Sequence, residues 1–322
     1  MTEFELIDRF FRRPARNAVL GVGDDAALVA PSPGYEIAAS VDMLVEGRHF
    51  FADADAEALG HKALAVNLSD LAAMGATPRW ALLACALPAV DEHWVAAFAR
   101  GFFALADAHG VDLVGGDTTR GPRNLCVTVL GEVPRGAALR RSGARDGDPI
   151  WVSGHLGDAA LALAHRQGRV RLDASDLASC EIALVRPVPR VALGRCLRGI
   201  ATAAIDISDG LVGDLGHVLQ ASQIGATIDL DALPRSGALE RQLGSAAREV
   251  ALQCLLAGGD DYELCFTAPA AREADIAALG DRLGLPLTRI GVTTARHEGL
   301  QVRDAAGRAL DPLPRAFDHF AP

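Results

Sequence analysis

The spacing of apolar residues predicts alternating helices and strands in the first half of the chain. Apolar side chains recur at helical spacing from Phe4 to Phe11, so we expect a short N-terminal helix. The same reading predicts strands over 35–45, 79–87, 111–114 and near 125–133, and helices over 56–75 and 91–109. Gly115-Gly116-Asp117 is expected to turn the chain after the third of these strands.

The second half has the same mixed character. Residues 134–148 are rich in Arg, Gly and Ala and show no clear period, so we place a domain boundary there. This gives an N-terminal domain over 1–137 and a C-terminal domain over 138–322. The second domain is expected to begin with a strand at 150–153 and to contain helices after Gly157 and near 189–200, with alternation continuing to about 303. The expected fold class is therefore α/β, of the α+β type, in two domains.

Composition and charge exclude several classes of protein. The 322 residues include 31 basic and 41 acidic side chains, a net charge of −10, which argues against a general nucleic-acid binder. No apolar stretch reaches about 18 residues, so neither a transmembrane helix nor a membrane partner is expected. Lys62 is the only lysine and lies outside any Walker A motif, which excludes a P-loop. The six cysteines form no Cys-x-x-Cys pair and lie mostly among apolar residues, as expected for reduced thiols in a cytoplasmic protein.

Acidic residues gather beside glycines and at the ends of the expected elements. Five segments show this pattern: Gly23-Asp24-Asp25, Ser40-Val41-Asp42, Asn67-Leu68-Ser69-Asp70, Gly116-Asp117-Thr118 and Asp206-Ile207-Ser208-Asp209-Gly210. Each segment alone is typical of turns and helix caps. If the five converge, their carboxylates repel one another, and Mg²⁺ ions would offset that repulsion while binding phosphate oxygens. The pattern therefore favours a site for several metal ions and a phosphate.

The remaining candidates each allow two interpretations. Residues 21–26 match a dinucleotide fingerprint, but two carboxylates within them would repel a pyrophosphate, so we reject that reading. Arg141 is either a solvated charge of the linker or a clamp on a phosphate. His49 is either structural or functional, and the acidic residues of 260–263 are either solvated loop charges or substrate contacts.

Several longer segments carry a more specific signal. They are residues 21–27, 62–76, 115–122, 141–144, 206–211 and 258–264, which read GVGDDAA, KALAVNLSDLAAMGA, GGDTTRGP, RSGA, DISDGL and GGDDYEL. In these segments the chain resembles the thiamine-monophosphate kinase family, of the superfamily named for aminoimidazole ribonucleotide synthetase. The resemblance extends over nearly the whole chain.

The resemblance implies an activity and a domain arrangement. The activity is direct, in-line transfer of the γ-phosphoryl group of ATP to thiamine monophosphate, the last step of thiamine diphosphate biosynthesis. ATP is then a co-substrate, and several Mg²⁺ ions assist the transfer. The N-terminal domain is expected to bind ATP and Mg²⁺ and to mediate a homodimer, and the C-terminal domain is expected to be a second α/β domain.

The resemblance also implies roles for individual residues. The metal ligands would be Asp25, Ser40, Val41 through its main-chain carbonyl, Asp42, Asp70, Asp117, Asp206 and Asp209. The nucleotide contacts would be Gly116, Asp117, Arg141 and Ser208, and the substrate contacts would be His49, Asp260 and Phe317. Asp42, Asp117 and Arg141 are the predicted catalytic residues.

Three positions depart from the family's pattern. Val41 stands where relatives often have Thr, Asp260 where Glu is common, and Phe317 where Tyr or Trp occurs. These departures affect the substrate contacts more than the reaction. Two alternative functions remain open: aminoimidazole ribonucleotide synthetase activity, and a non-catalytic sensor of a nucleotide or a thiamine phosphate.

Overall fold

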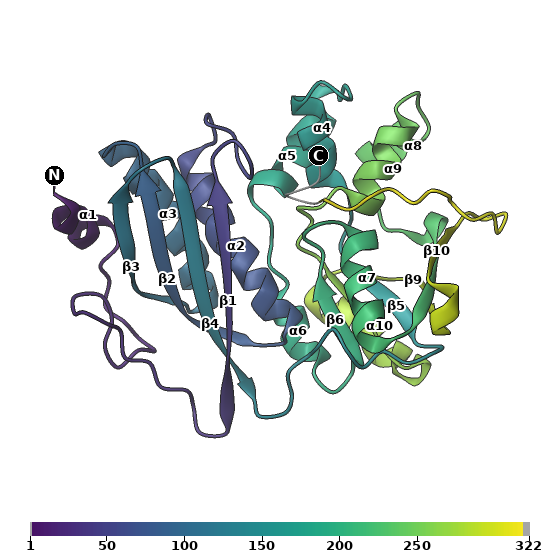
Figure 1. Cartoon of the computed structure of the whole chain (residues 1–322), viewed down its shortest axis with the longest axis horizontal. Helices are drawn as coiled ribbons and strands as arrows, with labels where there is room; N and C mark the ends of the chain where they lie inside the picture. The colour runs from purple at the N-terminus through teal and green to yellow at the C-terminus, as the bar shows by residue number, and fades with distance from the viewer. Residues whose placement is uncertain (1, 318–322) are drawn as a thin grey trace. The chain divides into compact units, whose positions relative to one another are not determined.

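The computed structural model describes residues 2–317 and divides the chain into two units (Figure 1). The N-terminal unit comprises residues 1–71 and 76–138, and the C-terminal unit comprises residues 72–75 and 139–322. Within residues 2–317, no helix combines the length and the hydropathy that a membrane span requires.

A four-stranded sheet forms the centre of the N-terminal unit. Its strands are β1 (Tyr35–Val45), β2 (Thr77–Leu87), β3 (Asp112–Arg120) and β4 (Asn124–Pro134), in the order β1-β4-β2-β3. β4 is antiparallel to both of its neighbours, whereas β2 and β3 are parallel. The helices of this unit are α1 (Glu3–Phe10), α2 (Ala56–Ala73) and α3 (Glu92–His109). In the view of Figure 1, α2 and α3 lie behind the sheet and cover one of its faces.

The sequence explains where α3 begins and ends. The Asp91 side chain accepts hydrogen bonds from the main-chain N–H groups of His93 and Trp94, which caps the N-terminus of the helix. Gly110 ends the helix in the left-handed conformation, with φ 65°. Phe98 and Phe102 are buried, with ring centroids 6.3 Å apart, so one face of α3 packs into the core of the unit.

Alternate residues of β1 lie on opposite faces of the sheet. Ser40 and Asp42 point to the side that α2 and α3 cover, and both are partly buried. Ile37, Val41 and Met43 point to the other side, where they are 40%, 57% and 51% exposed. We call this second side, to which Ile37, Val41 and Met43 belong, the open face.

The glycines of β3 overturn one prediction from the sequence. A turn is expected at 115–117, whereas β3 continues through these residues. The pairing of β2 with β3 shifts between Ala81 and Leu82, which marks a β-bulge. Gly116 has φ 149°, and a Cβ atom there would lie 1.8 Å from the main-chain oxygen of Leu83. The glycines therefore allow a bulge and a close approach of two strands rather than a turn.

A six-stranded sheet forms the centre of the C-terminal unit. Its strands are β5 (Pro149–Ser153), β6 (Ala203–Asp206), β7 (Gly225–Asp229), β8 (Leu264–Thr267), β9 (Leu287–Thr294) and β10 (Leu300–Arg303), in the order β10-β7-β9-β5-β8-β6. β10 and β7 are parallel, and the other neighbouring strands are antiparallel.

Helices pack around this second sheet. They are α4 (Asp158–Arg166), α5 (Ala174–Val185), α6 (Val191–Leu197), α7 (Leu211–Ser222), α8 (Gly237–Leu243), α9 (Arg248–Ala257) and α10 (Glu273–Leu283), with short 3₁₀ helices η1 (Leu230–Ala232), η2 (Ala270–Arg272) and η3 (Arg296–Glu298). Ile150 of β5, Ile205 of β6 and Leu215 of α7 belong to one buried cluster, so strands and helices share a core. Two mixed units of helices and sheet confirm the expected fold class.

Candidate active site

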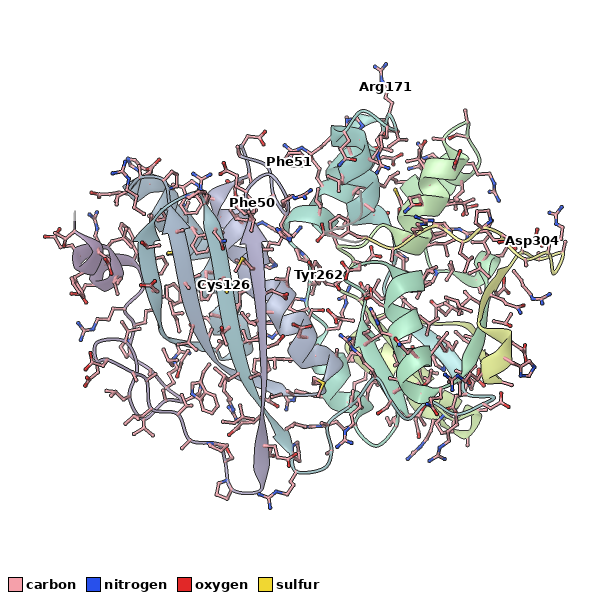
Figure 2. The ribbon with its side chains drawn as sticks, viewed as in Figure 1. Phe50, Phe51, Cys126, Arg171, Tyr262 and Asp304 are labelled. Atoms are coloured by element: carbon pink, nitrogen blue, oxygen red, sulfur yellow. The ribbon has the colours of Figure 1, made fainter. Side chains whose placement is uncertain are left out.

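The N-terminal unit contains a cavity of about 1050 Å³, lined by α1, the loop 22–29 and residues of β2, β3 and β4. Asp25, Gly116 and Asp117 all line it, so the structure brings these three predicted site residues together. Arg12 lines it too, and its guanidinium lies against the loop, because a Cβ atom on Gly23 would be 2.8 Å from Nη2. The cavity therefore combines carboxylates, a cation and main-chain groups around one space. Cys126, labelled in Figure 2, contributes from β4.

Ser40, Asp42 and Asp70 belong to a second group, between β1 and α2. The Ser40 hydroxyl donates a hydrogen bond to a carboxylate oxygen of Asp70 at 2.5 Å. The main-chain N–H of Asp42 donates to Oδ1 of Asn67 at 3.0 Å, and a main-chain carbonyl of α2 holds the Asn67 amide in turn. The segment Ser40–Asp42 is thus fixed to α2 at both of its ends. The side chain of Val41 points to the open face, away from this group.

Main-chain contacts within their own units hold His49 and Arg141. His49 accepts a hydrogen bond at Nδ1 from the main-chain N–H of Val45 (3.0 Å), which orients its ring in the turn after β1. The main-chain carbonyl of Arg141 accepts from the Ser222 hydroxyl (3.2 Å) at the C-terminal end of α7. Ser208 precedes the other end of this helix, and 12 helical residues span about 18 Å. The predicted roles of His49 and Arg141 stay predictions.

In the C-terminal unit, Asp214 organises the turn between β6 and α7. Its Oδ2 accepts hydrogen bonds from the main-chain N–H groups of both Ser208 and Asp209, each at 3.0 Å. Burial raises the pKa of Asp214 to about 7, the charge of Asp209 contributes to the rise, and the main-chain hydrogen bonds oppose it. Asp206, the last residue of β6, is 5% exposed. Three predicted site residues therefore lie within four positions of one constrained turn.

The loop 258–263 and the end of the described chain meet this turn. The main-chain N–H of Asp260 donates to the Ser208 carbonyl at 2.8 Å. The main-chain N–H of Phe317 donates to the Asp209 carbonyl at 3.3 Å. The structure thus brings the predicted substrate contacts Asp260 and Phe317 to the segment that carries a predicted nucleotide contact and a predicted metal ligand.

Glu263 is a buried structural group and not a solvated loop charge. Its side chain is 7% exposed, and the Arg190 guanidinium pairs with both of its carboxylate oxygens. The Ser153 hydroxyl donates to Oε2 at 2.5 Å. Burial raises the pKa of Glu263, and the hydrogen bonds and charge of Arg190 oppose the rise. A Cβ atom on Gly154 would lie 2.0 Å from Oε1, so only glycine leaves room for this carboxylate.

The predicted metal ligands are divided between the two units. Asp25, Ser40, Val41, Asp42, Asp70 and Asp117 belong to the N-terminal unit, and Asp206 and Asp209 belong to the C-terminal unit. Among residues 2–317, no three or more His, Cys, Asp and Glu side chains are grouped closely enough to hold a metal ion. The donor chemistry fits Mg²⁺, because this ion takes carboxylate and other oxygen ligands and completes its shell with water and phosphate. The oxygens of Ser40 and Asp70, 2.5 Å apart, are donors of this kind.

Comparison with known proteins identifies the family. Residues 23–133 match the model for AIR synthase related protein, N-terminal domain, and residues 145–303 match the model for its C-terminal domain. The thiamine-monophosphate kinase of Salmonella typhimurium is 46% identical over 324 residues, which cover 99% of this chain and 98% of that protein. The chain belongs to the thiamine-monophosphate kinase family.

Two solved thiamine-monophosphate kinase structures resemble this one. The crystal structure of the enzyme from Stenotrophomonas maltophilia K279a has a TM-score of 0.85 and 49% identity, and the match covers 96% of this chain and 98% of that chain. AaThiL complexed with AMPPCP and TMP has a TM-score of 0.78 and 30% identity, with 90% and 89% covered. The family resemblance seen in the sequence is therefore confirmed.

Sequence reasoning did not single out Asp214, Arg190 or Tyr262. Asp214 lies among apolar residues of the segment that forms α7, and a lone carboxylate in such a place signals a buried, hydrogen-bonded group. Arg190 precedes its partner Glu263 by 73 positions, so no local pattern joins the two. Tyr262 adopts a left-handed conformation with φ 50°, which its sequence does not indicate.

Proposed function

We propose that this chain transfers the γ-phosphoryl group of ATP to the phosphate of thiamine monophosphate, giving thiamine diphosphate and ADP. The observation that carries the proposal is the 46% identity to a thiamine-monophosphate kinase over 99% of the chain. The AaThiL complex supports it, because AMPPCP is a non-hydrolysable analogue of ATP and TMP is the acceptor in the family's name.

The residues suit a reaction between two anions. The acceptor phosphate is already ionised at neutral pH, so the transfer needs positioning and charge neutralisation more than a strong base. The Mg²⁺ ligands would be Asp25, Ser40, the Val41 carbonyl, Asp42, Asp70, Asp117, Asp206 and Asp209. Bound Mg²⁺ would supply positive charge to the phosphate oxygens.

The remaining contacts follow the same logic. Gly116 has no side chain where β3 approaches β2, so its main chain can lie against a nucleotide in the cavity that it lines. Arg141 would place a guanidinium on the transferring phosphate, and the Ser208 hydroxyl would contact the nucleotide. His49, Asp260 and Phe317 would contact thiamine monophosphate, with the Phe317 ring offering a stacking surface.

The open face supports a homodimer. Ile37, Val41 and Met43 expose 40–57% of their surface, and an apolar sheet face of this kind is typical of a protein interface. A second copy of the chain is the occupant that the family resemblance implies. A Val41→Arg variant is then expected to be monomeric by light scattering, and a variant that stays dimeric would contradict this interface.

We also propose that the protein works in the cytoplasm with neither a nucleic-acid nor a membrane partner. The six cysteines, all within the described residues, are free thiols, which suits a reducing compartment. The net charge of −10 gives no basic footprint for nucleic acid.

The test is an assay of both products. Purified protein is incubated with ATP, MgCl₂ and thiamine monophosphate, and thiamine diphosphate and ADP are quantified. Equal amounts of both products, lost when Mg²⁺ is omitted and absent when free thiamine replaces the monophosphate, would support the proposal. Folded protein that binds ATP without forming product would instead favour a sensor of nucleotide or thiamine phosphate.

A further inference from the structure

The loop that carries Asp260 is tied to its surroundings along its main chain. The N–H groups of Asp260 and Tyr262 donate to the carbonyls of Ser208 and Ile207, each at 2.8 Å. The Ile207 N–H donates back to the Glu263 carbonyl at 2.8 Å. The loop therefore follows the 207–208 segment residue by residue, with the buried Glu263 carboxylate at its end.

Two residues of this loop have unusual backbone conformations. Asp260 has φ 62° and Tyr262 has φ 50°. Aspartate tolerates the left-handed region, but a bulky aromatic residue rarely adopts it. Such conformations persist only when surrounding contacts hold them, and they concentrate at functional sites.

The Tyr262 side chain connects these two residues. Tyr262, labelled in Figure 2, is 8% exposed. Its hydroxyl donates a hydrogen bond to Oδ1 of Asp260 at 3.1 Å. A buried tyrosine hydroxyl needs an acceptor, and the acceptor here is a carboxylate oxygen. The left-handed conformations at positions 260 and 262 bring the phenol and the carboxylate within reach across two residues. One Asp260 oxygen is thereby held in a defined place.

We propose that Tyr262 is a positioning residue for the acceptor substrate, which holds the Asp260 carboxylate in the orientation that binds thiamine monophosphate. The proposal rests on the proposed function, in which Asp260 contacts the substrate. Thiamine monophosphate carries a thiazolium cation and an aminopyrimidine with N–H donors, and an ionised carboxylate binds either group. Because Asp is shorter than the Glu that relatives often carry, its reach depends more strongly on its orientation.

The test is Tyr262→Phe, which removes the hydroxyl and keeps the ring. We expect the KM for thiamine monophosphate to rise about fivefold to tenfold, while the KM for ATP and kcat stay within twofold, because one positioning hydrogen bond is lost. A purely structural role would change all three constants or none. An unchanged KM for thiamine monophosphate, or equal changes in both KM values, would overturn the proposal. Thermal melting checks that each variant is folded.

A double-mutant cycle with Asp260→Ala identifies the partner of the hydroxyl. If Tyr262 acts through Asp260, Tyr262→Phe has no further effect on the KM in the Asp260→Ala background, and full additivity would refute the proposal. Thr202→Val is the matched control, because it removes a hydroxyl-to-carboxylate hydrogen bond (2.7 Å, to Asp148) elsewhere in the same unit, and it should leave both KM values unchanged.

This design separates the two proposals. If Asp260→Ala leaves the KM for thiamine monophosphate unchanged in an active kinase, the role of Tyr262 is refuted and the kinase function stands. If the wild-type protein has no kinase activity, calorimetric binding of thiamine monophosphate is compared between wild type and Tyr262→Phe. Weaker binding by the variant would support the role of Tyr262, and equal binding or no binding would refute it.

Discussion

Asp214 should make the protein less stable as the pH rises, and Asp214→Asn should remove that dependence. The buried carboxylate has a pKa of about 7 in the folded chain, above the ordinary value of 3.8. The folded state therefore binds the proton more tightly than the unfolded state, so the unfolding free energy falls as the pH rises from about 4 to about 7. The cost amounts to about 2 kcal/mol at pH 5 and about 4 kcal/mol at pH 8, so between these pH values the folded state loses ~2–3 kcal/mol.

The assay is urea denaturation of both proteins at pH 5 and pH 8, in EDTA so that bound metal does not contribute. The wild type should lose ~2–3 kcal/mol more unfolding free energy between these pH values than Asp214→Asn does. Any constant offset that the amide introduces cancels in this comparison. Unfolding free energies of the two proteins that change in parallel between pH 5 and pH 8 would refute the reasoning.

Asp304→Asn is the control for this experiment. Hydrogen bonds from Arg308 lower the pKa of Asp304 below its usual value, so this carboxylate is ionised in both the folded and the unfolded chain above pH 5. Its replacement should not alter the pH dependence between pH 5 and pH 8. A change as large as that for Asp214→Asn would show that the loss of any carboxylate has this effect.

Three further substitutions test the site and its supports. Asp42→Asn should reduce kcat at least ~100-fold with an unchanged melting temperature, because a lost charge at a phosphoryl-transfer site costs transition-state stabilisation. Near-wild-type turnover would contradict the predicted catalytic role of Asp42. Gly116→Ala should lower the unfolding free energy, measured by urea denaturation, by about 3 kcal/mol, because its Cβ atom would lie 1.8 Å from a main-chain oxygen. The control Gly136→Ala, with open space around it, should lower it by about 1 kcal/mol. Arg190→Ala should lower the unfolding free energy by about 3 kcal/mol, since it leaves the Glu263 carboxylate buried without its cation, and a loss below 1 kcal/mol would argue against that ion pair.

The elements with strong periodicity could be predicted closely from the sequence. The strand expected over 35–45 has those bounds as β1, and the helix expected over 91–109 begins one residue later as α3. In both segments the local pattern and the tertiary environment agree, since one face of α3 is buried and one side of β1 is partly buried from Ala38 to Leu44. The turn expected at 115–117 failed because glycine also serves bulges and close strand contacts, which depend on a strand far away in the sequence.

The candidate site could be predicted as a set of residues but not as an arrangement. Acidic motifs indicated which carboxylates to consider, yet local spacing did not show that Asp25 and Asp117 share a cavity while Asp42 lies between β1 and α2. The structural roles of Arg190 and Asp214 could not be predicted for a similar reason. Arg190 and Glu263 are 73 positions apart, and folding alone brings their side chains together. The raised pKa of Asp214 depends on its burial, which the local sequence does not show.

Strand β1 carries two sets of side chains with different surroundings along a single run of residues. Ser40 and Asp42 are directed toward α2, whereas Val41 and Met43 are directed toward the open face. Replacements at the second set therefore change the open face while the contacts of Ser40 and Asp42 with α2 stay in place. The departure from the family pattern at Val41 lies on this face, and so do Cys126 and Thr128 of β4, which pair with Met43 and Val41 and line the cavity of Asp25 and Asp117.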